Sequence, residues 1–562
     1  MKNKKTANSS AVSFQLLLLG ACCTSFAFCA PTAQDYPPWD GSYAQTVYVL
    51  DITVGFHVDE VLFLQAIQGI TAREKPQVYL NHFGRLGYNV WLEETQKKHK
   101  FEIVTVSGIW ELAEIFKDYI KGYVTYPVWE SEAMNYAATL AGVLDAVPVT
   151  PRLRAEANSR GLQQLDNAED YEDISRIIQK YGSRLNKKKF LNHNNTFDWT
   201  LRDYGIKHRC ITVYEDQAGL QPVYDFMEPN AVMFGYGRDG EIYGVRGTSE
   251  HQIIYTATNQ ALNMSFYEEG STEVYKQPHE PIDKNLKAES GKHYVSFSYS
   301  DGDNIQWLIN ELPLDVTRWA AQRTVPLGWP LTPLLPELAP VILEYLYKTA
   351  ALTDTIFSAG CGYGYIFPSL YEKDNLIEYG KMTAEAMRRS GMEYVEIYDE
   401  YFTGETSTEV FEAYLRNPQI KGILYRTGDY YAGGRGFLKW VNGKPVVSYK
   451  DALWNVNYST TNIPENEKNK DIYQLAYRIS QYDKDYTKID GYTMVMVHAW
   501  SHLYDSIQKA ADWLAENDPD VVIVTPVTLV RLIEENVPKT NAAPDRHRFS
   551  PDWDYSSVAD LY

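Results

Sequence analysis

The stretch YVSFSYSDGDN, residues 294–304, joins an apolar run typical of a β-strand to a polar turn at its carboxyl end. Similar runs recur downstream with helical segments between them, near residues 355–360, 393–398, 421–426, 493–498 and 520–525. One of those helices, LIEYGKMTAEAMRRSG, carries Gly391 as its expected carboxyl-terminal cap. This alternation predicts α/β layers with a parallel sheet. Its length predicts a (β/α) barrel of seven or eight strands, regular or irregular, over residues 284–545.

Shorter runs of the same kind precede the barrel and predict small N-terminal α/β units. The first strand and helix are TVYVLDI, residues 46–52, and VDEVLFLQAIQGI, residues 58–70. We place three units at residues 36–100, 101–187 and 188–283. The segment 275–293 is rich in Pro, Lys and Glu, so we expect a linker there. Residues 546–562 are expected to form a surface tail.

The N-terminus has the pattern of a secretory signal peptide over residues 1–33. Three lysines precede an apolar run that ends in small residues. Leu-Gly-Ala-Cys at residues 19–22 matches a bacterial lipobox, which would make Cys22 a lipid anchor. Ordinary cleavage after Ala27 or Ala33 is the alternative. We expect export to the periplasm or the outer cell surface, as a lipoprotein if the lipobox is used.

Charge and cysteine content exclude several classes of protein. The formal net charge is −20 and no stripe of Lys and Arg offsets it, so we expect no nucleic-acid partner. Only Cys210 and Cys361 lie beyond the leader, and two cysteines cannot form a disulfide framework for a chain of 562 residues. The 44 tyrosines suit polar ligands, because each ring has an apolar face and a hydrogen-bonding tip, although they also fit a habit of composition.

Four of the predicted barrel strands end in polar side chains. Working residues of parallel barrels lie at the carboxyl ends of the strands. Each cluster alone also fits an ordinary turn or a helix cap, but four on one rim predict a site. The clusters are SDGDN (300–304), EIYDEYF (396–402), ILYRTGDYY (423–431) and MVMVHAWSH (494–502).

Glycoside hydrolysis is the first chemistry that this rim could support. The reaction needs two facing carboxyl groups, one that donates a proton and one that acts as a base or nucleophile. We predict Glu400 as acid/base, Asp301 as nucleophile or base, and Asp303 as the residue that orients Asp301. An oligosaccharide or polysaccharide is then the substrate, and no metal or other cofactor is expected.

Two alternatives stay open for the same residues. Metal-dependent deacetylation needs a carboxylate and histidines around a Lewis-acid ion, and Asp301, His498 and His502 could hold a divalent metal. A glycan-binding protein without catalysis would use the same rim. We expect the substrate to be bound by Asn304, Trp329, Tyr363, Tyr365, Asp399, Asp429, His498 and Trp500.

The stretch FSAGCGYGYIFP, residues 357–368, places glycines among aromatic rings. It is not a dinucleotide-binding fingerprint, because Phe367 stands where the last glycine should be. It follows a predicted strand, so we expect it on the same rim, with Tyr363 and Tyr365 lining the ligand cleft. Aromatic packing in a corner between domains is the alternative.

This stretch resembles the signature of the GxGYxYP glycoside hydrolase family. Gly362, Gly364, Tyr365 and Pro368 match the signature, and Phe367 replaces its second tyrosine. The segments SYSDGDNIQW, PLGWPLTP and LQAIQGITAREKPQVYL also look like that family. The resemblance covers nearly the whole mature chain. It implies small N-terminal α/β domains before a C-terminal barrel, in exported proteins of glycan-degrading bacteria.

Overall fold

A computed structural model describes most of the chain after residue 40. All the described residues belong to one compact body, Trp39–Tyr562. The predicted signal peptide, the predicted tail, Glu400 and Asp429 lie outside them. Within the described part, every helix is too short or too polar to cross a membrane. The described residues are 41–53, 55–82, 87–128, 131–196, 200–270, 273–279, 283–399, 406–427, 436–454 and 465–542.

The first sheet has the order β2-β1-β3 and is parallel throughout. β3 pairs with β1, with Ile103 opposite Val47, so the segment after residue 100 completes the first unit. The boundary that we expected at residue 100 therefore falls inside this sheet. Nearly every residue of α1 is buried, as an apolar helix packed on several sides must be. The elements are β1 (Thr46–Asp51), α1 (Val58–Thr71), β2 (Val78–Asn81), α2 (Gly87–His99), β3 (Glu102–Thr105) and α3 (Ile109–Ile115).

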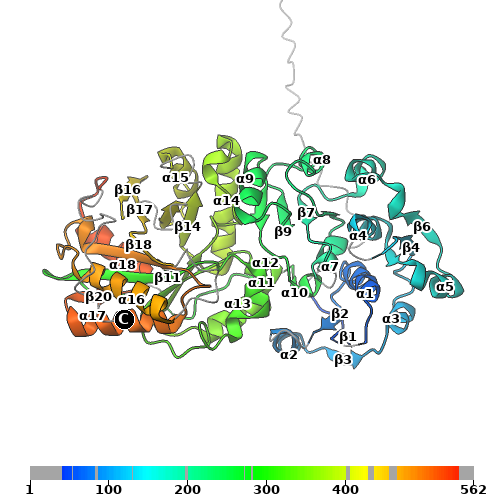
Figure 1. The fold of residues 1–562 in the computed structure, drawn as a ribbon, viewed down its shortest axis with the longest axis horizontal. Helices are drawn as coiled ribbons and strands as arrows, with labels where there is room; N and C mark the ends of the chain where they lie inside the picture. The colour runs from blue at the N-terminus through cyan, green and yellow to red at the C-terminus, as the bar shows by residue number, and fades with distance from the viewer. Residues whose placement is uncertain are drawn as a thin grey trace, which may run out of the picture. The chain divides into compact units, whose positions relative to one another are not determined.

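Two further small parallel sheets follow along the chain (Figure 1). Their strand orders are β5-β4-β6 and β10-β9-β7-β8. The unit of the second sheet comprises β4 (Gly122–Thr125), α4 (Glu132–Leu144), β5 (Ala146–Val149), α5 (Pro151–Ser159), β6 (Gln164–Asn167) and α6 (Ile174–Tyr181). The unit of the third sheet, called the third unit below, comprises β7 (Lys189–Asn192), α7 (Arg202–Lys207), β8 (Ile211–Val213), α8 (Gln221–Tyr224), β9 (Val232–Gly235), α9 (Glu241–Glu250), β10 (Ile254–Thr256) and α10 (Met264–Tyr267).

The C-terminal part is built on a ten-stranded sheet, and the expected closed barrel is not shown. The strand order is β16-β17-β15-β14-β13-β12-β11-β19-β18, with β20 also paired to β11. Among the described residues, no strand pairing joins β16 or β17 to β18, so the ring of hydrogen bonds stays open. The sheet is mixed because β16 pairs with β17 in antiparallel fashion, whereas the other pairs are parallel.

Helices separate most of the ten strands along the chain, but β15, β16, β17 and β18 follow one another with no described helix between them. The strands are β11 (His293–Tyr299), β12 (Leu327–Leu331), β13 (Asp354–Ser358), β14 (Tyr394–Asp399), β15 (Gly422–Thr427), β16 (Leu438–Val441), β17 (Lys444–Ser448), β18 (Asp451–Leu453), β19 (Tyr492–Val497) and β20 (Val521–Ile523). The helices are α11 (Ile305–Asn310), α12 (Leu335–Leu338), α13 (Pro340–Thr349), α14 (Lys373–Ser390), α15 (Thr408–Leu415), α16 (Glu465–Ser480), α17 (Tyr504–Asn517) and α18 (Pro526–Asn536). Gly391 caps α14 in the left-handed conformation, as its sequence predicts.

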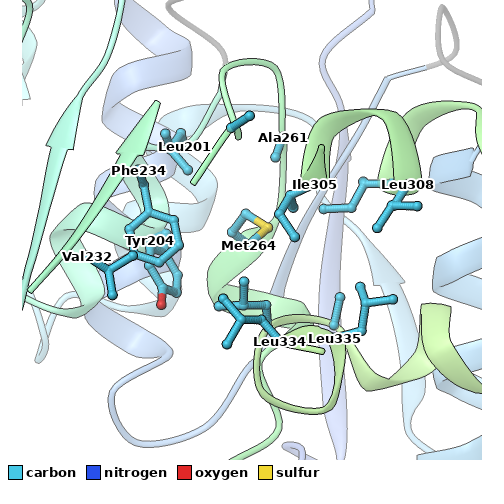
Figure 2. Close-up of a cluster of buried hydrophobic side chains, with 14 of the residues drawn as sticks. Leu201, Tyr204, Val232, Phe234, Ala261, Met264, Ile305, Leu308, Leu334 and Leu335 are labelled. Atoms are coloured by element: carbon cyan, nitrogen blue, oxygen red, sulfur yellow. The ribbon is translucent and has the colours of Figure 1, made fainter. Parts of the chain in front are cut away.

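The third and C-terminal sheets share one apolar core. Figure 2 shows Leu201, Tyr204, Phe234 and Met264 from the third unit facing the same cluster as Ile305 and Leu335 from the C-terminal part. Because apolar area on both sides is removed from water at once, this contact stabilises the two parts against each other. The placement of β10 beside the C-terminal loops follows from this packing.

Candidate functional site

Four carboxyl groups gather from the turn after β11, from the middle of β14 and from the start of α9. Asp301 and Asp303 lie in the turn after β11, Glu396 lies on β14, and Glu241 is the first residue of α9. Burial and the charges of Asp301 and Asp303 raise the pKa of Glu241 to about 7. Burial raises the pKa of Glu396 to about 7, with a further contribution from the same two aspartates. The two aspartates thus act electrostatically on both glutamates, and the four residues are called the acid cluster below.

The turn that carries the two aspartates is held tightly by its neighbours. A side chain at Gly302 would place its Cβ 1.4 Å from the carbonyl oxygen of Pro330, so only glycine fits. Asp301 has a left-handed φ of 67°, which is uncommon outside glycine and concentrates at functional sites. Ser300 Oγ donates to the Asp301 carboxylate. Asn304, expected as a substrate ligand, accepts from the backbone of Trp307 at 3.2 Å and caps α11.

Asp303 lies against the stretch FSAGCGYGYIFP, residues 357–368, which is called the glycine-rich loop below. A Cβ at Gly360 would be 2.6 Å from Asp303 Cβ and 3.1 Å from its Oδ2. Gly360 itself has a φ of 54°. Burial and the charge of Asp301 raise the pKa of Asp303 to about 6, although Arg426 opposes the shift. The loop therefore contributes to the site through the close approach of its backbone.

Glu396 and Arg426 form a buried ion pair next to the aspartates. Arg426 Nε lies 2.9 Å from Glu396 Oε1, and Glu396 is 1% exposed. The guanidinium also lies 4.9 Å from the centre of the Tyr398 ring. Its positive charge lowers the pKa of Glu396, Asp303 and Glu241 against the effect of burial. Arg426 thus keeps part of the acid cluster ionised near neutral pH.

Glu241 belongs to the site although the sequence did not indicate it. Tyr236 donates its hydroxyl hydrogen to Glu241 Oε2 at 3.0 Å. The segment that runs from β9 into α9 is MFGYGRDGE, in which Gly240 has a φ of 75° directly before Glu241. A glycine-rich strand-to-helix turn that ends in a carboxylate is a usable signal. The sequence alone does not connect Glu241 with Asp301, because Glu241 follows a strand of the third sheet and Asp301 follows a strand of the C-terminal sheet.

His498, Trp500 and His502 lie directly after the end of β19. Burial lowers the pKa of His498 while Asp301 opposes this, and His498 Nδ1 is 2.9 Å from Ser501 Oγ. His502 is fully buried, and its pKa falls to about 3. Trp500 is half-buried, with its ring 5.0 Å from that of Trp307. In the part of the chain that the structure describes, no three His, Cys, Asp or Glu residues are grouped so that they could hold a metal ion.

Trp329 and Asp399, expected as ligand contacts, are buried and form hydrogen bonds inside the protein. Trp329 is 1% exposed and donates from Nε1 to Asp354 Oδ1 at 3.1 Å. Asp399 is fully buried and accepts from Ser369 N at 3.1 Å and from Thr406 Oγ1. Each side chain already has buried partners, so we leave both out of the proposed site.

The two tyrosines of the glycine-rich loop lie in different surroundings. Tyr365 is 7% exposed, and its backbone forms a bridge with Tyr255 of β10. Its ring packs against Tyr398 at a centroid distance of 5.7 Å. The ring contacts of Tyr365 therefore lie within the C-terminal part, and its backbone bridge reaches the third unit. Tyr363 is half-buried, donates to Glu337 Oε2 at 3.1 Å, and lines a surface pocket of about 360 Å³ whose lining includes no member of the acid cluster.

Comparison with known proteins gives one consistent family. Models described as "GxGYxYP_N 1st domain", "GxGYxYP third domain" and "GxGYxYP putative glycoside hydrolase C-terminal domain" match residues 46–118, 188–268 and 291–534. A solved structure, "a putative hydrolase from Bacteroides thetaiotaomicron VPI-5482", is 26% identical with a TM-score of 0.78. The match covers 89% of this chain and 98% of that one. Among curated proteins, no relative is found.

Proposed function

Because this chain belongs to the GxGYxYP family, we propose that it is a glycoside hydrolase whose reaction takes place at the acid cluster. The name of the C-terminal family model and the name of the solved neighbour both support a hydrolase. The observation that carries the proposal is the gathering of Glu241, Asp301, Asp303 and Glu396 from three separate elements.

Glycosidic cleavage at neutral pH needs one protonated and one ionised carboxyl group. Within the acid cluster, the pKa values of Glu241 and Glu396 are about 7 and that of Asp303 is about 6. The cluster therefore holds both protons and negative charge near pH 7. We assign Asp301 as the nucleophile or base and Asp303 as the residue that orients it. Glu396, held by Arg426, positions the neighbouring acids. The substrate is an oligosaccharide or polysaccharide.

Turnover on a panel of oligosaccharides, with and without a chelator, tests this function. We expect reducing sugar to be released whether or not the chelator is present. Asp301→Asn should lower kcat/KM at least about a hundredfold, as loss of a base or nucleophile does. Asp512→Asn, on the exposed face of α17, is the matched control and should leave turnover unchanged.

Three results would contradict the proposal. Full activity of the Asp301→Asn variant would place the chemistry elsewhere. Release of acetate that stops with the chelator would identify a deacetylase. Binding of oligosaccharides without turnover would identify a glycan-binding protein.

A further inference from the structure

The third sheet is bonded directly to the two loops that border the acid cluster. Tyr255 N donates to Tyr365 O at 3.0 Å, and Tyr365 N donates to Tyr255 O at 2.8 Å. Ile305 N, next to the aspartate turn, donates to Ala257 O at 2.9 Å. These bonds join β10 to the glycine-rich loop and to the start of α11. The position of the third sheet relative to Asp301 and Asp303 is therefore fixed by main-chain contacts.

α9 is attached to the same loop, and the charges of Asp301 and Asp303 act on its first residue, Glu241. Phe367 N donates to Ser249 Oγ of α9 at 2.9 Å. Tyr255 donates its hydroxyl hydrogen to Tyr236 O at 2.9 Å, and Tyr236 in turn donates to Glu241 Oε2. A chain of contacts thus runs from the loop through two tyrosines to the Glu241 carboxyl. Such support limits the freedom of a side chain that must act at a defined point.

The surroundings of Glu241 differ from those of Glu396 in a way that matters for proton transfer. Glu396 is 1% exposed and ion-paired with Arg426, which favours its ionised form. Glu241 is half-buried, and its side-chain hydrogen bond comes from the neutral hydroxyl of Tyr236. The charged groups that act on it are Asp301, Asp303 and, more weakly, Arg426. Glu241 can therefore hold a proton near neutral pH while part of its surface stays exposed.

We propose that Glu241 is the proton donor for glycosidic cleavage, so that the third sheet contributes a catalytic residue to a site otherwise built by the C-terminal sheet. This inference rests on the proposed function. The Glu241 carboxyl gives its proton to the glycosidic oxygen as the bond to the anomeric carbon breaks, and the bonding electron pair passes to that oxygen. Asp301 either attacks the anomeric carbon or takes a proton from the attacking water. Burial and neighbouring negative charge keep the pKa of Glu241 at about 7, which suits this task at neutral pH.

Glycosides that share a sugar but differ in leaving group test this assignment. A 2,4-dinitrophenyl leaving group departs without protonation, whereas a methyl leaving group needs it. For Glu241→Gln we expect kcat/KM to fall at least about a hundredfold on the methyl glycoside and far less on the dinitrophenyl glycoside. Asp301→Asn should lose activity on both substrates. Glu516→Gln, at an exposed position of α17, is the matched control.

A second measurement does not depend on activity. In the wild-type protein, a Glu241 pKa of about 7 means that the folded state binds a proton more tightly than the unfolded state, so stability falls as pH rises through neutrality. Glu241→Gln removes this loss, and its melting temperature should exceed that of the wild type at pH 8 but not at pH 4.5.

The outcomes separate the inference from the function on which it rests. The role of Glu241 would be overturned if Glu241→Gln lost kcat/KM equally on the two glycosides. It would also be overturned if Glu400→Gln, and not Glu241→Gln, lost much more kcat/KM on the methyl glycoside than on the dinitrophenyl glycoside. So would a melting temperature with unchanged pH dependence. If Asp301→Asn still loses activity on both glycosides in that experiment, the proposal that the protein is a glycoside hydrolase is retained. If the wild type cleaves no glycoside, both proposals fail.

Discussion

Replacing Arg426 with Met removes the positive charge from the acid cluster while keeping an unbranched side chain. Glu396 then loses the guanidinium whose Nε lies 2.9 Å away, and its carboxylate is 1% exposed. Breaking one side of a buried ion pair typically costs about 3–5 kcal/mol, because the remaining charge is left without compensation. We expect a loss of this size in the free energy of unfolding at pH 8.

The same substitution should cost much less in acid. In the wild type, the pKa of Glu396 is about 7, whereas an ordinary glutamate has a pKa of 4.5. The folded state therefore binds this proton more tightly than the unfolded state, and the protein is about 3 kcal/mol less stable above pH 7 than below pH 4.5. Without Arg426, which lowers it, this pKa rises further. At pH 5 the carboxyl is then protonated and neutral, so most of the cost disappears.

Urea unfolding followed by tryptophan fluorescence at pH 5 and pH 8 measures both quantities, since Trp319 and Trp329 lie in the C-terminal core. The control is the double variant with Arg426→Met and Glu396→Gln. A neutral glutamine has no charge to leave unpaired, so the double variant should be more stable than the single one at pH 8. Equal losses at the two pH values, or a double variant no more stable than Arg426→Met at pH 8, would refute the reasoning.

Two further predictions concern the glycine-rich loop. Tyr365→Ala should lower the free energy of unfolding by about 3–5 kcal/mol, as truncation of a large core aromatic does, with little change in KM for any cleaved glycoside; unchanged stability with raised KM would instead make Tyr365 a ligand contact. Gly360→Ala should lower kcat/KM by about a hundredfold. The new Cβ would lie 2.6 Å from Asp303 Cβ, which is too close, so Asp303 must move. Gly443→Ala, with a φ of 73° and open space around it, carries similar backbone strain without that contact, and equal activity of the two variants would contradict the mechanism.

Local patterns predicted most strands of the C-terminal part but neither their number nor their closure. The runs near 393–398 and 493–498 became β14 and β19. β12 was missed because LGWPL contains a glycine and a proline, which usually argue against a central strand. Barrel closure depends on strand number, tilt and stagger together, and no local run of residues encodes these.

The candidate site was predicted in part. Asp301 and Asp303 follow a clear strand in a polar turn, so their place at its carboxyl end could be inferred from the sequence alone. Trp329 looked like a stacking platform because its residue type suits one, yet its ring packs between those of Tyr299 and Trp319. Residue type does not report burial, which depends on what the rest of the chain brings alongside.

The sequence by itself determined the α/β alternation, the family signature and the two aspartates of the turn, because each of these is written in residues close together along the chain. Only the tertiary structure decided that Glu241 meets those aspartates. About sixty residues separate them along the chain, and they belong to different units. Main-chain bonds between β10 and the glycine-rich loop bring them together. The same packing buried Tyr365 and raised the pKa of Glu241 and Glu396. Desolvation and charge coupling depend on distances in space, and those distances exist only once the chain has folded.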